Sequence, residues 1–132
     1  MLSLSLPGRV FLCTLPTDMR KSCDALAGLV EKELGQDPLA GDLFVFRSRR
    51  GDRLKLLYWD SDGLAIWYKR LEEGTFVFPT ADGQRLCVGT HGLLIRPAEL
   101  AMLLDGIDLA GVKRRKRYQR PQAARHELAR HG

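Results

Sequence analysis

Three apolar runs in the middle of the chain predict a set of neighbouring strands. They span Leu43–Arg47, Arg53–Trp59 and Leu64–Arg70, and each is rich in Leu, Val, Ile or aromatic residues. Polar segments that contain glycine separate the runs, at 48–52 and at 60–63. Short apolar runs joined by such turns are typical of consecutive antiparallel strands, so we predict a three-stranded meander at the centre of the fold.

Two other stretches carry the spacing of amphipathic helices. Between residues 17 and 34 apolar side chains recur every three or four positions, Thr17 or Asp18 offers an oxygen for the N-cap, and Gly35 provides a stop. Pro97 suits the first turn of a second helix that ends before a glycine. We predict a long N-terminal helix and a short C-terminal helix, both on one face of the sheet.

Shorter apolar runs predict further strands around the meander. Arg9–Thr14 and Thr75–Phe78 have strand composition, and Arg85–Val88 can pair back across the turn at Ala81–Gln84. His91–Ile95 is either a strand or the approach to the second helix. The predicted fold class is therefore α+β, with one domain and an antiparallel sheet built on the meander.

The charge of the chain is concentrated at its C-terminal end. Residues 1–112 contain 13 Lys or Arg and 15 Asp or Glu, whereas residues 113–132 contain eight Lys or Arg and a single Glu. We predict a folded domain over 1–112 and a basic tail over 113–132. Because the tail lacks apolar periodicity, we expect it to be disordered when it is not bound.

The composition also narrows the classes of protein that the chain can belong to. No run of apolar residues is long enough for a transmembrane helix, and Met1–Pro7 lacks the cationic start of a signal peptide, so a cytoplasmic location is expected. The three cysteines, an odd number without paired spacing, indicate reduced thiols. No membrane partner is expected.

Two basic segments are the candidate sites for nucleic acid. Lysine and arginine neutralise phosphates and release counterions, so compact clusters of them bind DNA with little sequence preference. One cluster lies at the first turn of the meander and the other in the tail, where an aromatic ring can stack on a base. The candidate residues are Arg47, Arg49, Arg50, Arg53 and Lys55, followed by Lys113, Arg114, Arg115, Lys116, Arg117, Tyr118 and Arg120.

Each of these features also has a purely structural interpretation. The basic turn can be a solvated turn in which Asp52 pairs locally and the charges prevent aggregation of sheet edges. The tail can serve solubility or bind an acidic protein. Four aromatic residues, Tyr58, Trp59, Trp67 and Tyr68, alternate in direction along the strands. Packing of both sheet faces is the favoured account of them, and exposure for base stacking or a protein partner is the alternative.

Catalytic and metal-binding patterns are weak in this sequence. Residues 60–63 resemble the opening of a calcium loop but lack the distal ligands, and Cys87 and His91 have no second pair with which to hold zinc. Scattered acids at Asp18, Asp24, Asp42 and Asp60 leave a metal-dependent nuclease as a third option, although a predicted turn or cap explains each of them. We predict no enzyme activity, no metal and no cofactor.

Several longer motifs resemble a family of transposition accessory proteins. The segments 16–22, 43–47 and 52–60, the run Trp67–Glu72 and the run Leu103–Asp108 are similar to the small TnpB protein, the second open reading frame, of the insertion-sequence 66 family. The resemblance covers residues 8 to 109. Two departures are Arg96, where Thr or Ser is expected before Pro97, and the strongly basic end after Gly111.

The resemblance implies a bacterial mobile-element protein that acts beside a separate transposase and another small accessory protein. It supplies no catalytic residues. The leading functional hypothesis is a non-catalytic accessory factor for DNA transposition that contacts DNA through the basic loop and tail. The alternative is a protein-interaction adaptor that holds the transposase through an exposed sheet face or edge, with a homo-oligomer left open.

Overall fold

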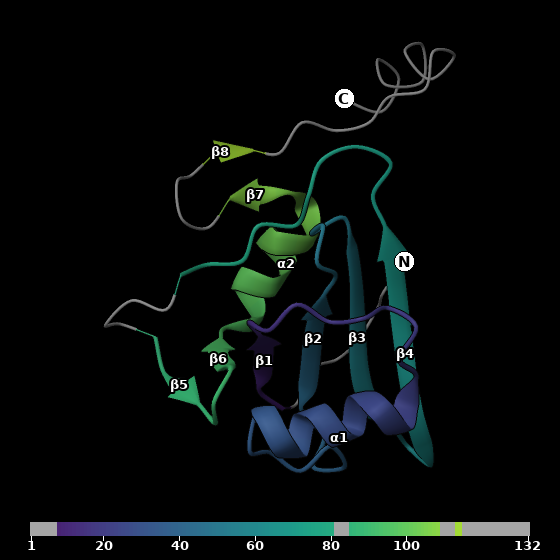
Figure 1. Cartoon of the computed structure of the whole chain (residues 1–132). Helices are drawn as coiled ribbons and strands as arrows, with labels where there is room; N and C mark the ends of the chain where they lie inside the picture. Colours follow the sequence, from purple (N-terminus) through teal and green to yellow (C-terminus); the bar gives the residue numbers. More distant parts are fainter. Residues whose placement is uncertain (1–7, 81–84, 109–112, 115–132) are drawn as a thin grey trace.

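The computed structural model of the chain describes residues 8–80, 85–108 and 113–114, and these form a sheet with two short helices (Figure 1). The helices are α1 and α2 and the strands β1 to β8. In chain order the elements are β1 (Val10–Cys13), α1 (Cys23–Glu33), β2 (Leu43–Arg47), β3 (Arg53–Asp60), β4 (Gly63–Arg70), β5 (Cys87–Val88), β6 (Gly92–Ile95), α2 (Pro97–Asp105), β7 (Ile107–Asp108) and β8 (Lys113–Arg114).

The main sheet has six strands in the order β4-β3-β2-β1-β6-β5. The predicted meander of β2, β3 and β4 is present, with Phe44 opposite Leu57 and Leu57 opposite Ile66. The prediction of a purely antiparallel sheet is wrong, because β1 and β2 pair in parallel. The helix α1 joins them and carries the chain back across the sheet, so the second strand runs in the same direction as the first.

The two helices cover opposite faces of the sheet, so their predicted placement on one face is also wrong. Leu100 and Leu103 of α2 pack with the side of the sheet that carries Leu54 and Leu56. The buried side chains of α1 pack instead with the side that carries Leu57. Successive strand residues point to opposite faces, which is why β1 and β2 are apolar at nearly every position. The side of the sheet that packs with α2 is called the α2 face below, and the side that packs with α1 is called the α1 face.

The predicted long N-terminal helix is wrong, since α1 begins only at Cys23 and has 11 residues. Asp18 does not cap a helix. Its carboxylate accepts hydrogen bonds from the Arg20 backbone N–H, at 2.9 Å, and from the Arg20 side chain. Such an aspartate turn competes with helix formation, and the chain reaches Ser22 before the helix starts. The predicted end is confirmed, because Gly35 follows the helix with φ +62°.

The second helix matches its prediction and begins with an unexpected cap. Arg96 makes no side-chain capping bond, but Glu99 accepts the Arg96 backbone N–H at 3.0 Å. The buried Glu99 carboxylate also pairs with the Arg85 guanidinium. Although desolvation favours its protonated form, the Arg96 backbone and Arg85 together hold the pKa of Glu99 below its ordinary value.

We expect Glu99→Gln to lower the free energy of unfolding by about 1–3 kcal/mol at neutral pH, because it removes the buried carboxylate charge that pairs with Arg85. A carboxyl whose folded pKa is depressed stabilises the fold above its unfolded pKa and loses that contribution as the pH falls through the folded value. The difference between the two proteins should therefore shrink below about pH 4.5. Urea unfolding at neutral and acidic pH measures this, and an equal difference at both would contradict it.

The expected strand at Thr75–Phe78 is wrong, because this segment joins no sheet. Phe76 and Phe78 are buried in the core of the α2 face, and the Phe76 N–H donates to the Gly51 carbonyl at 2.7 Å. The segment is thus held by side-chain burial and by the hairpin turn. The strand β5 pairs with β6 instead, and the predicted turn at 81–84 lies outside the described residues.

The predicted tail begins at β8, which pairs antiparallel with β7. Residues 115–132 lie outside the described residues, so the division at 112/113 stays a prediction. In the described part of the chain, neither helix has the length and apolar character needed to cross a membrane.

Candidate nucleic-acid interface

The β2–β3 hairpin ends in a tight basic turn at residues 48–52. The Gly51 N–H donates to the Ser48 carbonyl at 3.0 Å, and Gly51 has φ +81°, which a glycine adopts without strain. The Ser48 hydroxyl accepts the Arg53 N–H at 3.1 Å and donates to the Asp52 carboxylate at 3.3 Å. These bonds fix the turn and leave Arg49 and Arg50 exposed at its tip.

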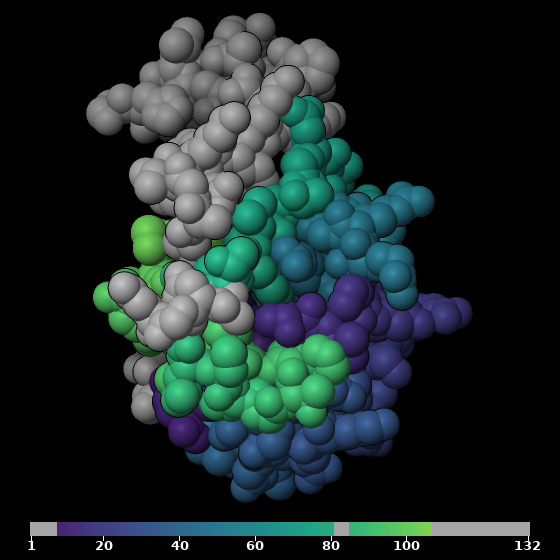
Figure 2. Space-filling model, turned by 60° about the vertical axis from the view of Figure 1, so that its left-hand side comes forward, coloured from purple at the N-terminus to yellow at the C-terminus, as the bar shows by residue number. Residues whose placement is uncertain are grey.

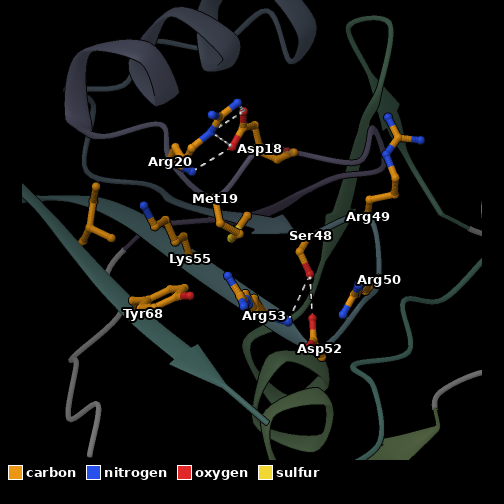
Figure 3. Close-up of a pocket in the computed structure, with 12 residues that line it drawn as sticks. Asp18, Met19, Arg20, Ser48, Arg49, Arg50, Asp52, Arg53, Lys55 and Tyr68 are labelled. Atoms are coloured by element: carbon orange, nitrogen blue, oxygen red, sulfur yellow. Dashed lines mark hydrogen bonds and ion pairs between the residues drawn. The ribbon is translucent and has the colours of Figure 1, made fainter.

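An open pocket of about 720 Å³ lies between this turn and the segment that precedes α1 (Figure 3). Figure 2 shows the N-terminal part of the chain, in purple, lying against the blue surface of the strands and of α1. Five cationic and two acidic side chains line the pocket. Its lining residues are Thr17, Asp18, Met19, Arg20, Ser48, Arg49, Arg50, Asp52, Arg53, Lys55, Ile66 and Tyr68.

Two backbone carbonyls tie the walls of the pocket together. The Thr17 N–H donates to the Arg47 carbonyl at 2.9 Å, at the end of β2. The Lys55 Nζ atom donates to the Lys21 carbonyl at 2.8 Å. Segment 17–21 is therefore attached to the hairpin, although about 30 residues separate the two in sequence.

The structure brings four of the five predicted loop residues together and separates the fifth. Arg49, Arg50, Arg53 and Lys55 all line the pocket. Arg47 does not, because it lies opposite Leu54 in the β2–β3 register and so points to the α2 face.

Arg47 is tied to the core rather than to the pocket. Its guanidinium carbon lies 4.1 Å from the centre of the Phe78 ring, and its Nη1 donates to the Phe76 carbonyl at 3.0 Å. Burial lowers the pKa of Arg47 below its ordinary value, as expected for a charge partly removed from water. These contacts give Arg47 a structural role in holding segment 76–78.

The aromatic residues divide between the two faces, as the alternation predicts. Tyr58 and Trp67 pack against the core of the α2 face. Trp59 and Tyr68 are 37% and 47% exposed, so the expectation that all four serve core packing is wrong for these two. The Tyr68 ring lies in the pocket, with the Lys55 Nζ atom 5.4 Å from its centre.

Asp18, Met19, Arg20 and Tyr68 line the pocket but were not among the predicted site residues. Tyr68 could have been identified from the sequence, because the alternation of side chains along the strands places some of the aromatic residues on an exposed side. No local signal places segment 17–20 beside the hairpin, because long-range contacts hold it there, namely the bond from the Thr17 N–H to the Arg47 carbonyl and the packing of Met19 on the core of the α1 face.

The acidic residues leave the pocket with an excess of positive charge. Asp18 pairs with Arg20 at 2.7 Å, and the hydrogen bonds from Arg20 keep the pKa of Asp18 well below its ordinary value. Asp52 is engaged by the Ser48 hydroxyl. Within the described residues, Arg49, Arg50 and Arg53 make no ion pair, so their charges face solvent and any ligand.

The tail residues are only partly covered by the structure. Lys113 and Arg114 form β8, and the other predicted tail residues lie outside the described ranges. Those residues are Arg115, Lys116, Arg117, Tyr118 and Arg120.

No group of three or more His, Cys, Asp or Glu side chains is placed to hold a metal ion among residues 8–80 and 85–106, where side chains are described. The acids behind the nuclease option are dispersed. Asp18 pairs with Arg20, and the buried Asp42 carboxylate pairs with Arg9. Cys13, Cys23 and Cys87 are free thiols, and burial raises the pKa of Cys13.

The fold and the site define a class: a small mixed-sheet domain that carries an open cationic pocket beside a rigid hairpin turn. The chain belongs to the family described as "IS66 Orf2 like protein", which matches residues 8–114. The resemblance of the motifs to this family is therefore confirmed. The family indicates a role in transposition as an accessory protein.

Two relatives come from Sinorhizobium fredii (strain NBRC 101917 / NGR234). The chain is 40% identical to the uncharacterized protein y4jC over 107 residues, which is 81% of this chain and 86% of that protein. It is 43% identical to the uncharacterized protein y4hO over 100 residues, which is 76% of this chain and 81% of that protein. No solved structure matches the chain significantly.

Proposed function

We propose that the protein is a non-catalytic accessory factor of transposition that contacts DNA. The contact is made by the pocket cations Arg49, Arg50, Arg53 and Lys55. The predicted basic tail adds a second contact with the phosphate backbone.

One observation carries the proposal: unpaired guanidinium groups gather on a single concave surface. Arg49 and Arg50 lie at the tip of a turn that hydrogen bonds fix, and Arg53 begins the strand that follows it. The three form no ion pair in the described part of the chain. Among the described residues, none of the three makes a structural contact of the kind that ties Arg20 to the Asp18 carboxylate or Arg47 to the Phe76 carbonyl. Positive charge held at a fixed surface attracts phosphates and gains free energy from counterion release.

A salt titration of DNA affinity tests the proposal. With four to six phosphate contacts, the logarithm of the binding constant should fall against the logarithm of salt concentration with a slope of about −4 to −5. The double variant Arg49→Ala/Arg50→Ala should weaken binding to every duplex sequence alike and make the slope less negative by about 2. Fluorescence anisotropy with a labelled duplex measures both quantities.

The matched control also removes two positive charges, but from residues that do not line the pocket. Lys32 is exposed on α1, and Lys69 is exposed on the α2 face opposite Leu54. The double variant Lys32→Ala/Lys69→Ala should leave the slope close to that of the natural protein. Equal effects of the two double variants, or no binding even at low salt, would refute the proposal.

The adaptor alternative is favoured by a different observation. In the described part of the sheet, β4 is an edge strand of eight residues, and the exposed Tyr68, Lys69 and Arg70 lie at its end. An unpaired edge of this length can accept a strand from another chain. Co-purification with the transposase that survives nuclease treatment and high salt would favour this function over DNA contact.

A further inference from the structure

We propose that the pocket binds DNA as a single strand, with one unpaired base against Tyr68 and the neighbouring phosphates on the cations around it. This inference rests on the proposed contact with DNA and adds the form of DNA that the site accepts.

The shape of the site favours an unpaired strand. Proteins read duplex DNA by inserting a helix or a β-ribbon into a groove. Here Arg49, Arg50 and Arg53 border a hollow of about 720 Å³, a volume within the usual range of small-ligand sites. A base inside a duplex cannot enter such a hollow, whereas a base that has left the stack can.

The chemistry of the walls also suits a nucleotide. Met19, Ile66 and the Tyr68 ring supply apolar surface, and guanidinium groups border the same hollow (Figure 3). Aromatic side chains beside a positively charged groove are the usual means of binding single strands without sequence preference. A site for phosphate alone would not require the exposed aromatic ring.

The neighbours of Tyr68 fix the position of its ring and leave part of the ring exposed for stacking. Strand β4 places it opposite Lys55, whose Nζ atom lies 5.4 Å from the ring centre and is fixed by the Lys21 carbonyl. With 47% of the residue exposed, the ring has surface to offer a base. The same Lys55 ammonium lies close enough to attract a phosphate of the bound strand.

The test compares a labelled single strand of about 12 nucleotides with a duplex of matched length, using the full chain and fluorescence anisotropy. We expect tighter binding of the single strand. Tyr68→Leu should weaken single-strand binding about tenfold and change duplex binding little. Tyr68→Phe should retain the natural affinity, because the ring remains.

Trp59→Leu is the matched control, since Trp59 is an exposed aromatic residue on the same face but outside the pocket. It should leave both affinities unchanged. Photocrosslinking of a single strand that carries 5-iododeoxyuridine gives a second readout on the natural protein. The crosslink should map to the peptide that contains Tyr68.

The outcomes separate this inference from the proposed function. If Arg49→Ala/Arg50→Ala weakens DNA binding but Tyr68→Leu does not affect the single strand, the inference is overturned and the proposed function stands. Binding of neither DNA form at low salt overturns both. If polyglutamate displaces the single strand as well as unlabelled DNA does, the pocket binds acidic polypeptide and the inference is overturned.

Discussion

Replacing Phe44 by alanine is expected to lower the free energy of unfolding by about 3–5 kcal/mol. Phe44 is fully buried at the centre of the α1 face. Its ring stacks on Phe11 of the parallel neighbour β1, with the ring centres 5.7 Å apart and the planes 13° from parallel. The substitution therefore removes a whole ring and leaves a cavity between the first strand pair and α1.

Chemical unfolding of Phe44→Ala and of a surface control measures this effect. Leu39 is 53% exposed, so Leu39→Ala should change the free energy of unfolding by less than about 0.5 kcal/mol. A loss below about 1 kcal/mol for Phe44→Ala would contradict the packing described for the α1 face.

Arg47→Ala is expected to give the second large effect, a destabilisation of about 2–4 kcal/mol. The variant loses the charged hydrogen bond to the Phe76 carbonyl and the stacking of the guanidinium on Phe78. Segment 76–78 then loses its attachment to β2. Because Arg47 points away from the pocket, the DNA affinity of the folded variant should equal that of the natural protein.

Arg50→Ala is the matched comparison, since Arg50 belongs to the same hairpin as Arg47 but lines the pocket. It should weaken DNA binding and change stability by less than about 0.5 kcal/mol. Thermal unfolding and anisotropy on both variants separate the two roles. A stable Arg47→Ala protein with weakened DNA binding would show that Arg47 belongs to the DNA contact.

The meander could be predicted because neighbouring residues in the sequence specify its strands and turns. The three apolar runs and the glycine turns at 48–52 and 60–63 define β2, β3 and β4 and join them as antiparallel neighbours. The same kind of signal predicts α2, where Pro97 and Gly106 mark the two ends.

The parallel pairing of β1 with β2 could not be predicted in this way, since turn chemistry specifies only strands that follow each other directly. The uninterrupted apolar run Val10–Cys13 was the available clue, because it is typical of a strand covered on both faces. The start of α1 was missed for a different reason. Asp18 has two uses with similar local signatures, a helix cap and an aspartate turn, and the structure has the turn.

The candidate site was half predictable. Charge clustering identified Arg49, Arg50, Arg53 and Lys55, which the structure brings together. The position of Arg47 depends on strand register, and the opposite wall at 17–21 depends on two long-range hydrogen bonds, one of them donated by the Lys55 side chain. The burial of Phe78, over which Arg47 stacks, also depends on tertiary packing rather than on strand propensity.

The bonds from Thr17 to Arg47 and from Lys55 to Lys21 have an energetic consequence for recognition. A cleft between two untethered loops would have to order both loops each time a ligand arrived, at a cost in conformational entropy. Here the hydrogen bonds to the end of β2 and from the Lys55 ammonium already hold the two walls of the pocket in place without a ligand. The protein is thus preorganised, so more of the interaction energy remains available as affinity.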